Sequence, residues 1–177
     1  MIADIAALLK TYKYCPFCAE LMQKSGETRL TCQSCGKNQF IIPNACTSII
    51  ITNRENQILL AKRKIKPQKD FWDLPGGFMQ PNETAEESAI RESKEELGID
   101  VKKLEYVGSA HDTYLYQGTE IPTLSIVFAT QVTDEKLTPQ DDVSMVQFFD
   151  PKDIPFENIA FDSMKETIKI FIKTQEA

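Results

Sequence analysis

Three glutamates, Glu92, Glu95 and Glu96, stand at the spacing that places side chains on one face of a helix. Like charges at this spacing repel one another, so a helix that needed only solubility would interleave lysine. A hard divalent cation prefers carboxylate oxygens and would neutralise the repulsion. We therefore interpret the three carboxylates as a site for Mg2+ or Mn2+; the alternative is an acidic helix face in contact with solvent.

Four of the cysteines form two C-x2-C pairs, Cys15 with Cys18 and Cys32 with Cys35. Two such turns can complete a tetrahedral thiolate shell around one Zn2+, and four protein ligands make such a site structural rather than catalytic. Two disulfides are the alternative, which an intracellular protein disfavours. A unit this small would need its metal to fold. Cys46 lies outside the pattern, and we expect it to be a small buried hydrophobe.

A helix must position the glutamates, and its ends are visible in the sequence. Thr84 and Glu87 form a T-x-x-E capping box, which predicts Thr84 as the N-cap. Gly98 stands where the helix should end. Ala85, Ala89 and Leu97 recur at multiples of four, which places one apolar stripe against a core.

The segment 77–99, GFMQPNETAEESAIRESKEELGI, resembles the signature of the Nudix hydrolase family, G-x5-E-x7-R-E-U-x-E-E-x-G-U, where U is aliphatic. The matching positions are Gly77, Glu83, Arg91, Glu92, Glu95, Glu96, Gly98 and Ile99. Ser93 departs from the pattern, because the family usually has an aliphatic residue there. Its hydroxyl can bond back to the carbonyl of Ala89, so the departure concerns packing and not the chemistry.

The resemblance implies an α/β protein: the Nudix α/β/α sandwich with a mixed sheet, preceded here by a small zinc-ribbon β-hairpin unit. It also implies that the Gly77 carbonyl joins the three glutamates in binding roughly two or three Mg2+ or Mn2+ ions. Glu83 and Arg91 would form a charge-assisted pair that orients the metal-binding loop and helix. The implied reaction is hydrolysis of a nucleoside diphosphate linked to another group.

We expect three parts: an N-terminal helix in 1–13, a zinc ribbon in 14–43 and the Nudix hydrolase domain in 44–177. In the first part, Ile2 to Leu9 is predicted to be a short amphipathic helix. In the second, Ser25 and Gly26 predict a hairpin turn. The third should contain strands near 47–52, 58–61, 104–116, 123–132 and 143–149 and a final helix over 162–172.

Substrate preference is weighed from the same resemblance. A zinc ribbon followed by this signature is similar to NADH pyrophosphatases, but their downstream S-Q-P-W-P-F-P motif is missing from residues 108–128. Zinc-ribbon enzymes of the FAD and ADP-ribose pyrophosphatase type are the better match. We therefore expect ADP-ribose or FAD, cleaved to AMP and a phosphorylated product, with NADH or NAD as the alternative.

A Nudix ligand sensor that does not hydrolyse, with a ribbon that contacts nucleic acid, is the alternative from another class. The usual sign of such a sensor is loss of signature carboxylates, and none is lost here. An interaction module built on the ribbon is a third possibility.

Further residues are candidates for substrate contact or catalysis. Phe71 or Tyr116 could stack on adenine. Glu120 and Asp142 are predicted substrate contacts and, with Asp141, the loop candidates for the general base, which in this family can also be a signature glutamate. His111, the single histidine, falls in a predicted strand and is expected to have a structural role.

The overall charge limits the partners. The 177 residues carry a formal net charge of −6, which argues against broad nucleic-acid binding because such binding depends on phosphate neutralisation. Small phosphorylated substrates remain compatible with this charge, because bound metals supply positive charge locally.

No apolar run is long enough to cross a membrane, and Asp4 stands where a signal peptide needs positive charge. We expect a cytoplasmic protein with a small-molecule nucleotide substrate, no membrane association and a possible homodimer.

Overall fold

The computed structural model describes residues 3–133 and 136–175. By its internal contacts the chain divides into two compact units. The first comprises Met1–Asn44 together with Thr113–Thr123, and the second comprises Ala45–Asp112 with Leu124–Ala177. The predicted boundary between 43 and 44 falls beside this division, but the prediction did not assign 113–123 to the first unit.

The first unit begins with a short helix, α1 (Ile5–Leu9). The prediction of a helix from Ile2 was wrong for its start, and Ile2 itself lies outside the described residues. The helix begins at Ile5 because the Asp4 carboxylate caps it, accepting a hydrogen bond from the amide of Ala7 at 3.0 Å.

A three-stranded antiparallel sheet follows, in the order β1 (Met22–Lys24), β2 (Arg29–Cys32) and β3 (Asn38–Phe40). The turn predicted at Ser25 and Gly26 joins β1 to β2. The sequence predicted a single hairpin, and the structure adds β3 to it. Leu8, Leu9, Leu30 and Ile41 form the small core of this unit, with Ile121 packed against it.

The second unit is built on a sheet with the order β10-β5-β4-β9-β8, to which β6 and β7 are added on β5 and β4. Its strands are β4 (Asn44–Thr52), β5 (Ile58–Arg63), β6 (Trp72–Asp73), β7 (Gly76–Phe78), β8 (Glu105–Tyr116), β9 (Thr119–Gln131) and β10 (Val143–Phe149). Strand β5 pairs antiparallel with both β10 and β4. Hydrogen bonds join Ser48 to Ser125 and Thr52 to Thr130, so residue numbers increase in the same direction along β4 and β9 and the two strands run parallel. The sheet is therefore mixed, as predicted.

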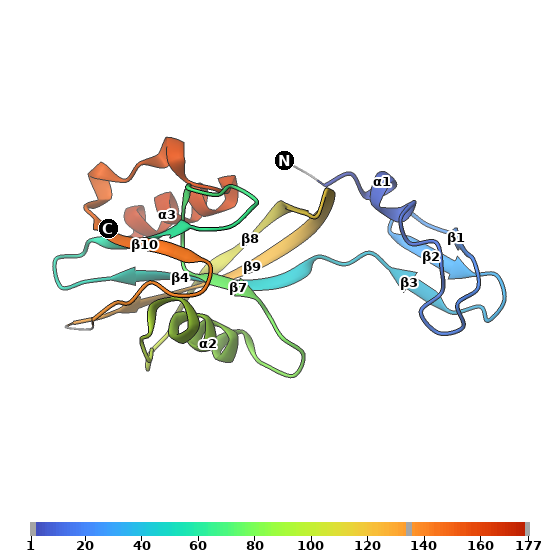
Figure 1. Cartoon of the computed structure of the whole chain (residues 1–177), viewed down its shortest axis with the longest axis horizontal. Helices are drawn as coiled ribbons and strands as arrows, with labels where there is room; N and C mark the ends of the chain where they lie inside the picture. Colours follow the sequence, from blue (N-terminus) through green and yellow to red (C-terminus); the bar gives the residue numbers. More distant parts are fainter. Residues whose placement is uncertain (1–2, 134–135, 176–177) are drawn as a thin grey trace. The chain divides into compact units, whose positions relative to one another are not determined.

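Two long helices cover opposite faces of this sheet, α2 (Ala85–Leu97) and α3 (Asp162–Gln175), as Figure 1 shows. Two short 3-10 helices, Pro151–Asp153 and Phe156–Asn158, precede α3. Successive strand residues point to opposite faces, so Ile49 and Ile51 of β4 pack in the core beneath α2 while Ile50 packs in the core beneath α3. This arrangement confirms the α/β/α sandwich. Within the described residues, no helix combines the length and the apolar character that a membrane span requires.

Candidate active site

The helix that carries the glutamates has the predicted ends. The amide of Glu87 donates to the Thr84 hydroxyl at 3.2 Å, and the amide of Thr84 donates to the Glu87 carboxylate at 2.8 Å, which completes the capping box. Gly98 ends the helix in the left-handed conformation, with φ at 73°. The buried Ser93 donates its hydroxyl hydrogen bond to the carbonyl of Ala89 at 2.9 Å, as predicted. These local features fix the rotation and length of α2, and so the face that the glutamates occupy.

The three glutamates share one helix face but have different surroundings. Glu96 is buried and accepts a hydrogen bond from the amide of Gly76 at 2.9 Å. Glu92 is also buried, whereas the Glu95 side chain is 48% exposed. That the three carboxylates serve one metal site stays a prediction; among the described residues, the four cysteines form the group whose ligand atoms all lie within 4.8 Å of one another. A cation on the same helix also contacts two of these glutamates.

That cation is Arg91, which contacts most of the neighbouring acids. Its Nε and Nη2 donate to the two carboxylate oxygens of Glu83 at 3.0 and 2.8 Å, so the predicted pairing is present. Its Nη1 donates to Glu92 at 2.6 Å and to Glu95 at 3.0 Å. Its Nη2 also reaches the carbonyl of Phe78 at 3.1 Å. The hydrogen bonds from Arg91, helped by the amide of Gln80, lower the pKa of Glu83 to about 2.

Gly76 and Gly77, the second of which is the first residue of the signature, allow close backbone approach. A Cβ on Gly77 would lie 2.5 Å from Oε1 of Glu92, so only glycine lets this carboxylate lie against the main chain. A Cβ on Gly76 would lie 2.8 Å from the Cα of Ser48 on the paired strand β4, and Gly76 has φ at 146°. The strand β7 is thereby brought against both β4 and α2.

The buried carboxyl groups carry an electrostatic cost in this site. Burial raises the pKa of Glu96 to about 9; the Gly76 amide opposes the shift, and the nearby carboxyl group of Asp142 adds to it. Burial also raises the pKa of Glu92, against the effect of Arg91. A divalent cation would offset this cost, because it favours the ionised form of both groups. The oxygen donors of Glu92, Glu95, Glu96 and Gly77 therefore fit Mg2+ or Mn2+.

Backbone hydrogen bonds bring Asp142 beside Glu96. The amide of Gln140 donates to the main-chain carbonyl of Glu96, and the amide of Thr138 donates to that of Leu97, both at 2.9 Å. The loop before β10 is thus attached to the end of α2. Asp142, Glu96 and Gly76 line a small cavity of about 20 Å3 together with Arg63 and Asp73.

Sequence reasoning missed the pair formed by Arg63 and Asp73. Nη1 of Arg63 donates to Asp73 at 2.9 Å, and the Leu74 amide donates to the other carboxylate oxygen at the same distance. Burial raises the pKa of Asp73 to about 6, although Arg63 opposes the shift. An acid between Trp72 and Leu74, in an otherwise apolar run, was the signal that could have revealed a buried partner.

Other candidate residues are distributed over both units. Phe71 is partly exposed directly before β6, in the unit that carries the glutamates, whereas Tyr116 and Glu120 are exposed residues of the first unit. His111 is exposed on β8. Cys46 is half-buried rather than buried as expected, because it lies near the start of β4, and burial raises the pKa of its thiol to about 11.

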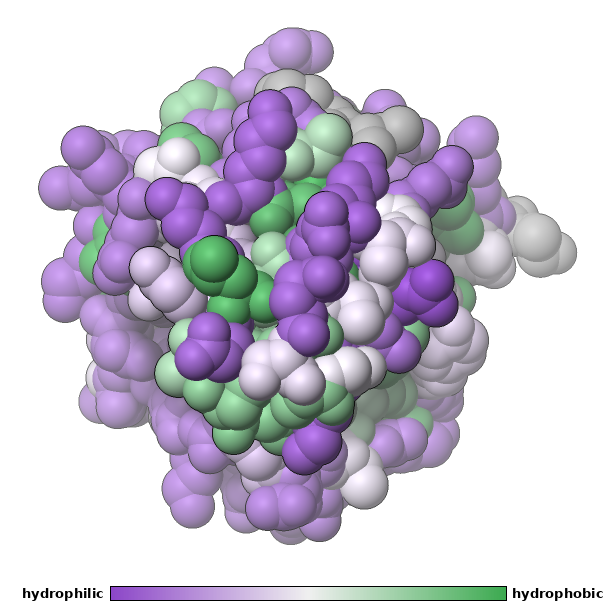
Figure 2. Space-filling view, turned by 90° about the vertical axis from the view of Figure 1, so that its right-hand side faces the viewer, coloured by the Kyte–Doolittle hydropathy of each residue, from purple (hydrophilic) through white to green (hydrophobic). Residues whose placement is uncertain are grey.

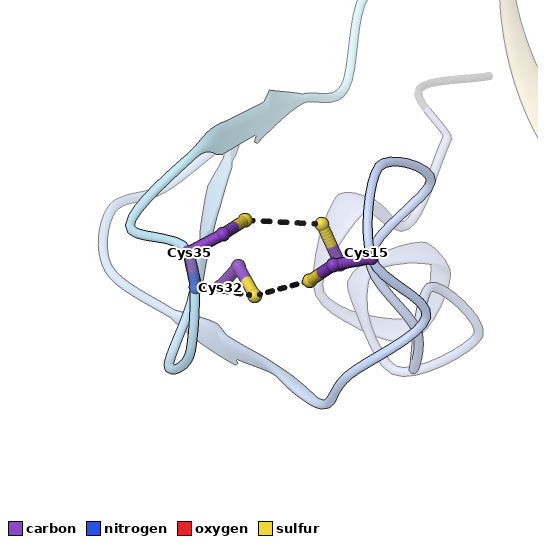
Figure 3. Close-up of side chains that lie close together, drawn as sticks. Cys15, Cys32 and Cys35 are labelled. Atoms are coloured by element: carbon purple, nitrogen blue, oxygen red, sulfur yellow. Dashed lines mark hydrogen bonds between the residues drawn. The ribbon is translucent and has the colours of Figure 1, made fainter.

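The four ribbon cysteines converge as their spacing predicts. All four Sγ atoms lie within 4.8 Å of one another, and all are free thiols. Sγ of Cys15 lies 3.7 Å from that of Cys35, and Sγ of Cys18 lies 3.5 Å from that of Cys32 (Figure 3). Each contact joins one C-x2-C pair to the other, which is the arrangement that a shared tetrahedral Zn2+ requires.

The ribbon unit also exposes several large hydrophobic side chains, namely Tyr12, Tyr14, Phe17, Leu21, Phe40 and Ile42. Lys37 covers part of one of them, with its ammonium nitrogen 4.2 Å from the ring centroid of Phe17. On the face drawn in Figure 2, hydrophobic side chains gather near the centre and hydrophilic ones surround them.

Comparison with known proteins establishes the family. The family described as "NUDIX domain" matches residues 43–169, so this chain belongs to the Nudix family, as the segment 77–99 indicated. An ADP-ribose pyrophosphatase from Methanocaldococcus jannaschii is 40% identical over 117 residues, which are 65% of this chain and 66% of that protein. A NAD-capped RNA hydrolase NudC from Haemophilus influenzae is 37% identical over 110 residues, which are 60% of this chain and 41% of that protein. This chain thus spans less than two thirds of either relative.

A solved structure supports the fold along most of the chain. The crystal structure of a Nudix hydrolase from Nitrosomonas europaea is 27% identical and superposes with a TM-score of 0.72. The similarity covers 93% of this chain and 92% of that one, so it extends beyond the Nudix domain into the N-terminal residues.

Proposed function

We propose that this chain is a metal-dependent hydrolase that cleaves the pyrophosphate bond of a nucleoside diphosphate linked to another group. Its preferred substrates are ADP-ribose or FAD, cleaved to AMP and a phosphorylated product. The observation that carries this proposal is the arrangement around α2, where Gly77 and the three glutamates lie beside the Glu83–Arg91 pair. The archaeal ADP-ribose pyrophosphatase relative supports the choice of ADP-ribose.

The signature residues have two different roles in this proposal, metal binding and positioning of the loop after β7. Glu92, Glu95, Glu96 and the Gly77 carbonyl would hold roughly two or three Mg2+ or Mn2+ ions. When bound, such ions neutralise the phosphates and lower the pKa of a bound water. Arg91 holds Glu83 with two hydrogen bonds, and so fixes the loop after β7 against α2.

Arg91 donates to one oxygen of Glu92 and one of Glu95, so the second oxygen of each carboxylate would remain for a metal ion. The two-point contact with Glu83 keeps the guanidinium in that position. Among the loop carboxylates considered as general base, Asp142 is the one that lies beside Glu96. We therefore assign it the role of accepting the proton of the attacking water.

The ribbon cysteines complete the proposal with one structural Zn2+. Four thiol ligands leave no open coordination position, so this metal would stabilise the first unit without taking part in hydrolysis.

An activity panel tests the function. The purified protein is incubated with ADP-ribose, FAD, NADH and NAD, with Mg2+ or Mn2+ and with neither, and AMP is measured by chromatography. We expect metal-dependent AMP release, fastest from ADP-ribose or FAD. NADH or NAD is the second candidate substrate; the Haemophilus relative, named as a hydrolase of NAD-capped RNA, supports a substrate of the NAD type. Tight binding without AMP release from any of the four would instead indicate a ligand sensor and overturn the hydrolase.

A further inference from the structure

A concentration of positive charge lies beside the candidate active site, in a chain whose net charge is −6. Between positions 62 and 69 the cationic residues are Lys62, Arg63, Lys64, Lys66 and Lys69. The first two are engaged within the protein: Lys62 lies 5.7 Å from the ring centroid of Trp72, and Arg63 pairs with Asp73. The other three are exposed.

Hydrogen bonds to Arg63 hold the loop that carries the three exposed lysines. Nε of Arg63 donates to the carbonyl of Pro67 at 2.9 Å. The amide of Asp70 donates to the carbonyl of Arg63, and the amide of Arg63 donates to the carbonyl of Phe71, both at 2.9 Å. The backbone of the loop is therefore closed at its base and braced across its middle.

The same loop contacts the residues next to the glutamates. The amide of Lys64 donates to the carbonyl of Asp142 at 2.7 Å, and Nζ of Lys64 donates to the carbonyl of Asp141 at 3.2 Å. Asp142 in turn lies beside Glu96, and both line the small cavity that Arg63 also lines. One residue, Asp142, therefore separates the start of the lysine loop from the proposed metal site.

The ammonium groups of these lysines keep N–H donors for an external anion, although that of Lys64 also donates to the carbonyl of Asp141. In the described part of the chain, no carboxylate forms an ion pair with Lys64, Lys66 or Lys69. Lysines of α3 differ, since Lys165 pairs with Asp162 and Lys169 pairs with Glu166, both at 2.9 Å or less. Unpaired ammonium groups next to a site for anionic substrates favour binding of a phosphate group.

We propose that Lys64, Lys66 and Lys69 form a phosphate subsite, which binds a phosphate group that the substrate carries in addition to the pyrophosphate. The proposal rests on the hydrolase function, because that function places the pyrophosphate beside Glu96. It extends the substrates beyond ADP-ribose and FAD, which carry no phosphate outside the pyrophosphate. The six-residue span of the loop and the net charge of −6 favour a single small-molecule phosphate over a nucleic-acid backbone.

The test compares substrates that differ by phosphate groups. The triple variant Lys64→Gln/Lys66→Gln/Lys69→Gln is matched to a control with the same change in charge, Lys165→Gln/Lys169→Gln/Lys173→Gln on α3. Each protein is assayed with ADP-ribose, with ADP-ribose 2′-phosphate and with diadenosine tetraphosphate. In the loop variant we expect KM to rise about tenfold for a substrate with additional phosphate, with kcat retained and ADP-ribose little affected. The α3 control should match the wild type.

The substrate that responds identifies the position of the extra phosphate. A selective loss with ADP-ribose 2′-phosphate places it on the ribose, and a selective loss with the tetraphosphate places it in the phosphate chain. An equal loss for all three substrates, or no loss, overturns the subsite. A NAD-capped RNA oligonucleotide is assayed as a fourth substrate, and a loss confined to it overturns the subsite in favour of an RNA contact.

Binding separates this inference from the hydrolase function. Calorimetry without added Mg2+ or Mn2+ compares the affinity of ADP-ribose 2′-phosphate and of diadenosine tetraphosphate with that of ADP-ribose. The wild type should bind at least one of the first two more tightly, and the loop variant should lose that preference. This result stands even if no substrate is cleaved, whereas turnover without any such preference leaves the hydrolase intact and removes the subsite.

Discussion

Arg91 and Glu83 form a two-point contact in which Nε and Nη2 of the guanidinium donate to both carboxylate oxygens, at 3.0 and 2.8 Å. The contact joins the loop after β7 to the middle of α2. It also leaves Nη1 of the same side chain free to hold Glu92 and Glu95. One arginine thus positions a structural acid and two proposed metal ligands.

This contact predicts a pH-dependent contribution to stability. The folded-state pKa of Glu83 is lowered from 4.5 to about 2, so its contribution is present above pH 4.5 and is lost as the pH falls towards 2. Glu83→Gln should therefore lower the free energy of unfolding at pH 7, and the difference from the wild type should shrink below pH 4.5. Urea denaturation at pH 7 and pH 3 measures both values. An equal difference at the two pH values would show that the Glu83 charge is not involved.

The glutamates predict loss of turnover without loss of the fold. Glu95→Gln and Glu96→Gln should each lower kcat about a hundredfold or more, because each removes a charged ligand of the proposed metals. Glu86→Gln is the matched control, since Glu86 is an exposed acid of the same helix at a variable position of the signature. Steady-state kinetics and Mn2+ binding are measured for all three. Wild-type kcat in both signature variants would remove the metal assignment.

Substitution of the two neighbouring glycines should affect different properties, activity at Gly77 and stability at Gly76. Gly77→Ala would push the Glu92 carboxylate, the end of a flexible side chain, so activity should fall while the melting temperature changes little. Gly76→Ala would press a methyl group on the backbone of β4 and strain φ at 146°, so the melting temperature should fall by several degrees or more, about 1–3 kcal/mol. Thermal unfolding and AMP release, measured on both variants, check the contrast. A melting temperature that falls more for Gly77→Ala would contradict it.

We predict that the zinc ion held by the ribbon cysteines stabilises the first unit and not the second. Cys32→Ser should lower the bound zinc from one ion per chain and expose the amides of residues 14–43 to exchange, because a small ribbon cannot hold its fold without the metal. Amides of α2 should keep their protection. Cys46→Ser serves as the control and should retain zinc, since Cys46 is not part of the thiol cluster. Metal analysis and hydrogen exchange give the two readings, and full zinc content in Cys32→Ser would exclude the site.

The features predicted correctly are those encoded within short stretches of sequence. The limits of α2 follow from Thr84, Glu87 and Gly98, and the thiol cluster follows from two C-x2-C turns. The expected start of α1 at Ile2 was wrong, because the carboxylate of Asp4 caps a helix that begins at Ile5. Local chemistry therefore determined these elements.

The features that were missed depend on contacts between distant segments. The position of Asp142 beside Glu96 results from main-chain hydrogen bonds that carry no side-chain signature. The same is true of the link between Lys64 and the loop that contains Asp142. The contacts from Arg91 to both Glu92 and Glu95 could not be predicted either, because helical spacing gives the face on which a residue lies but not its rotamer.

The long strands β8 and β9 belong to both units, since their shared tip, Thr113–Thr123, is grouped with the ribbon and their remaining residues with the Nudix sheet. Ile121 of that tip packs on the ribbon core, and the side chain of Asn44 donates to the carbonyl of Pro122 at 3.2 Å. No single cut in the polypeptide separates the two bodies. A chain shortened to begin at residue 45 would expose the apolar side chains of this tip to water. We therefore expect the shortened chain to aggregate, although it would retain the whole Nudix signature.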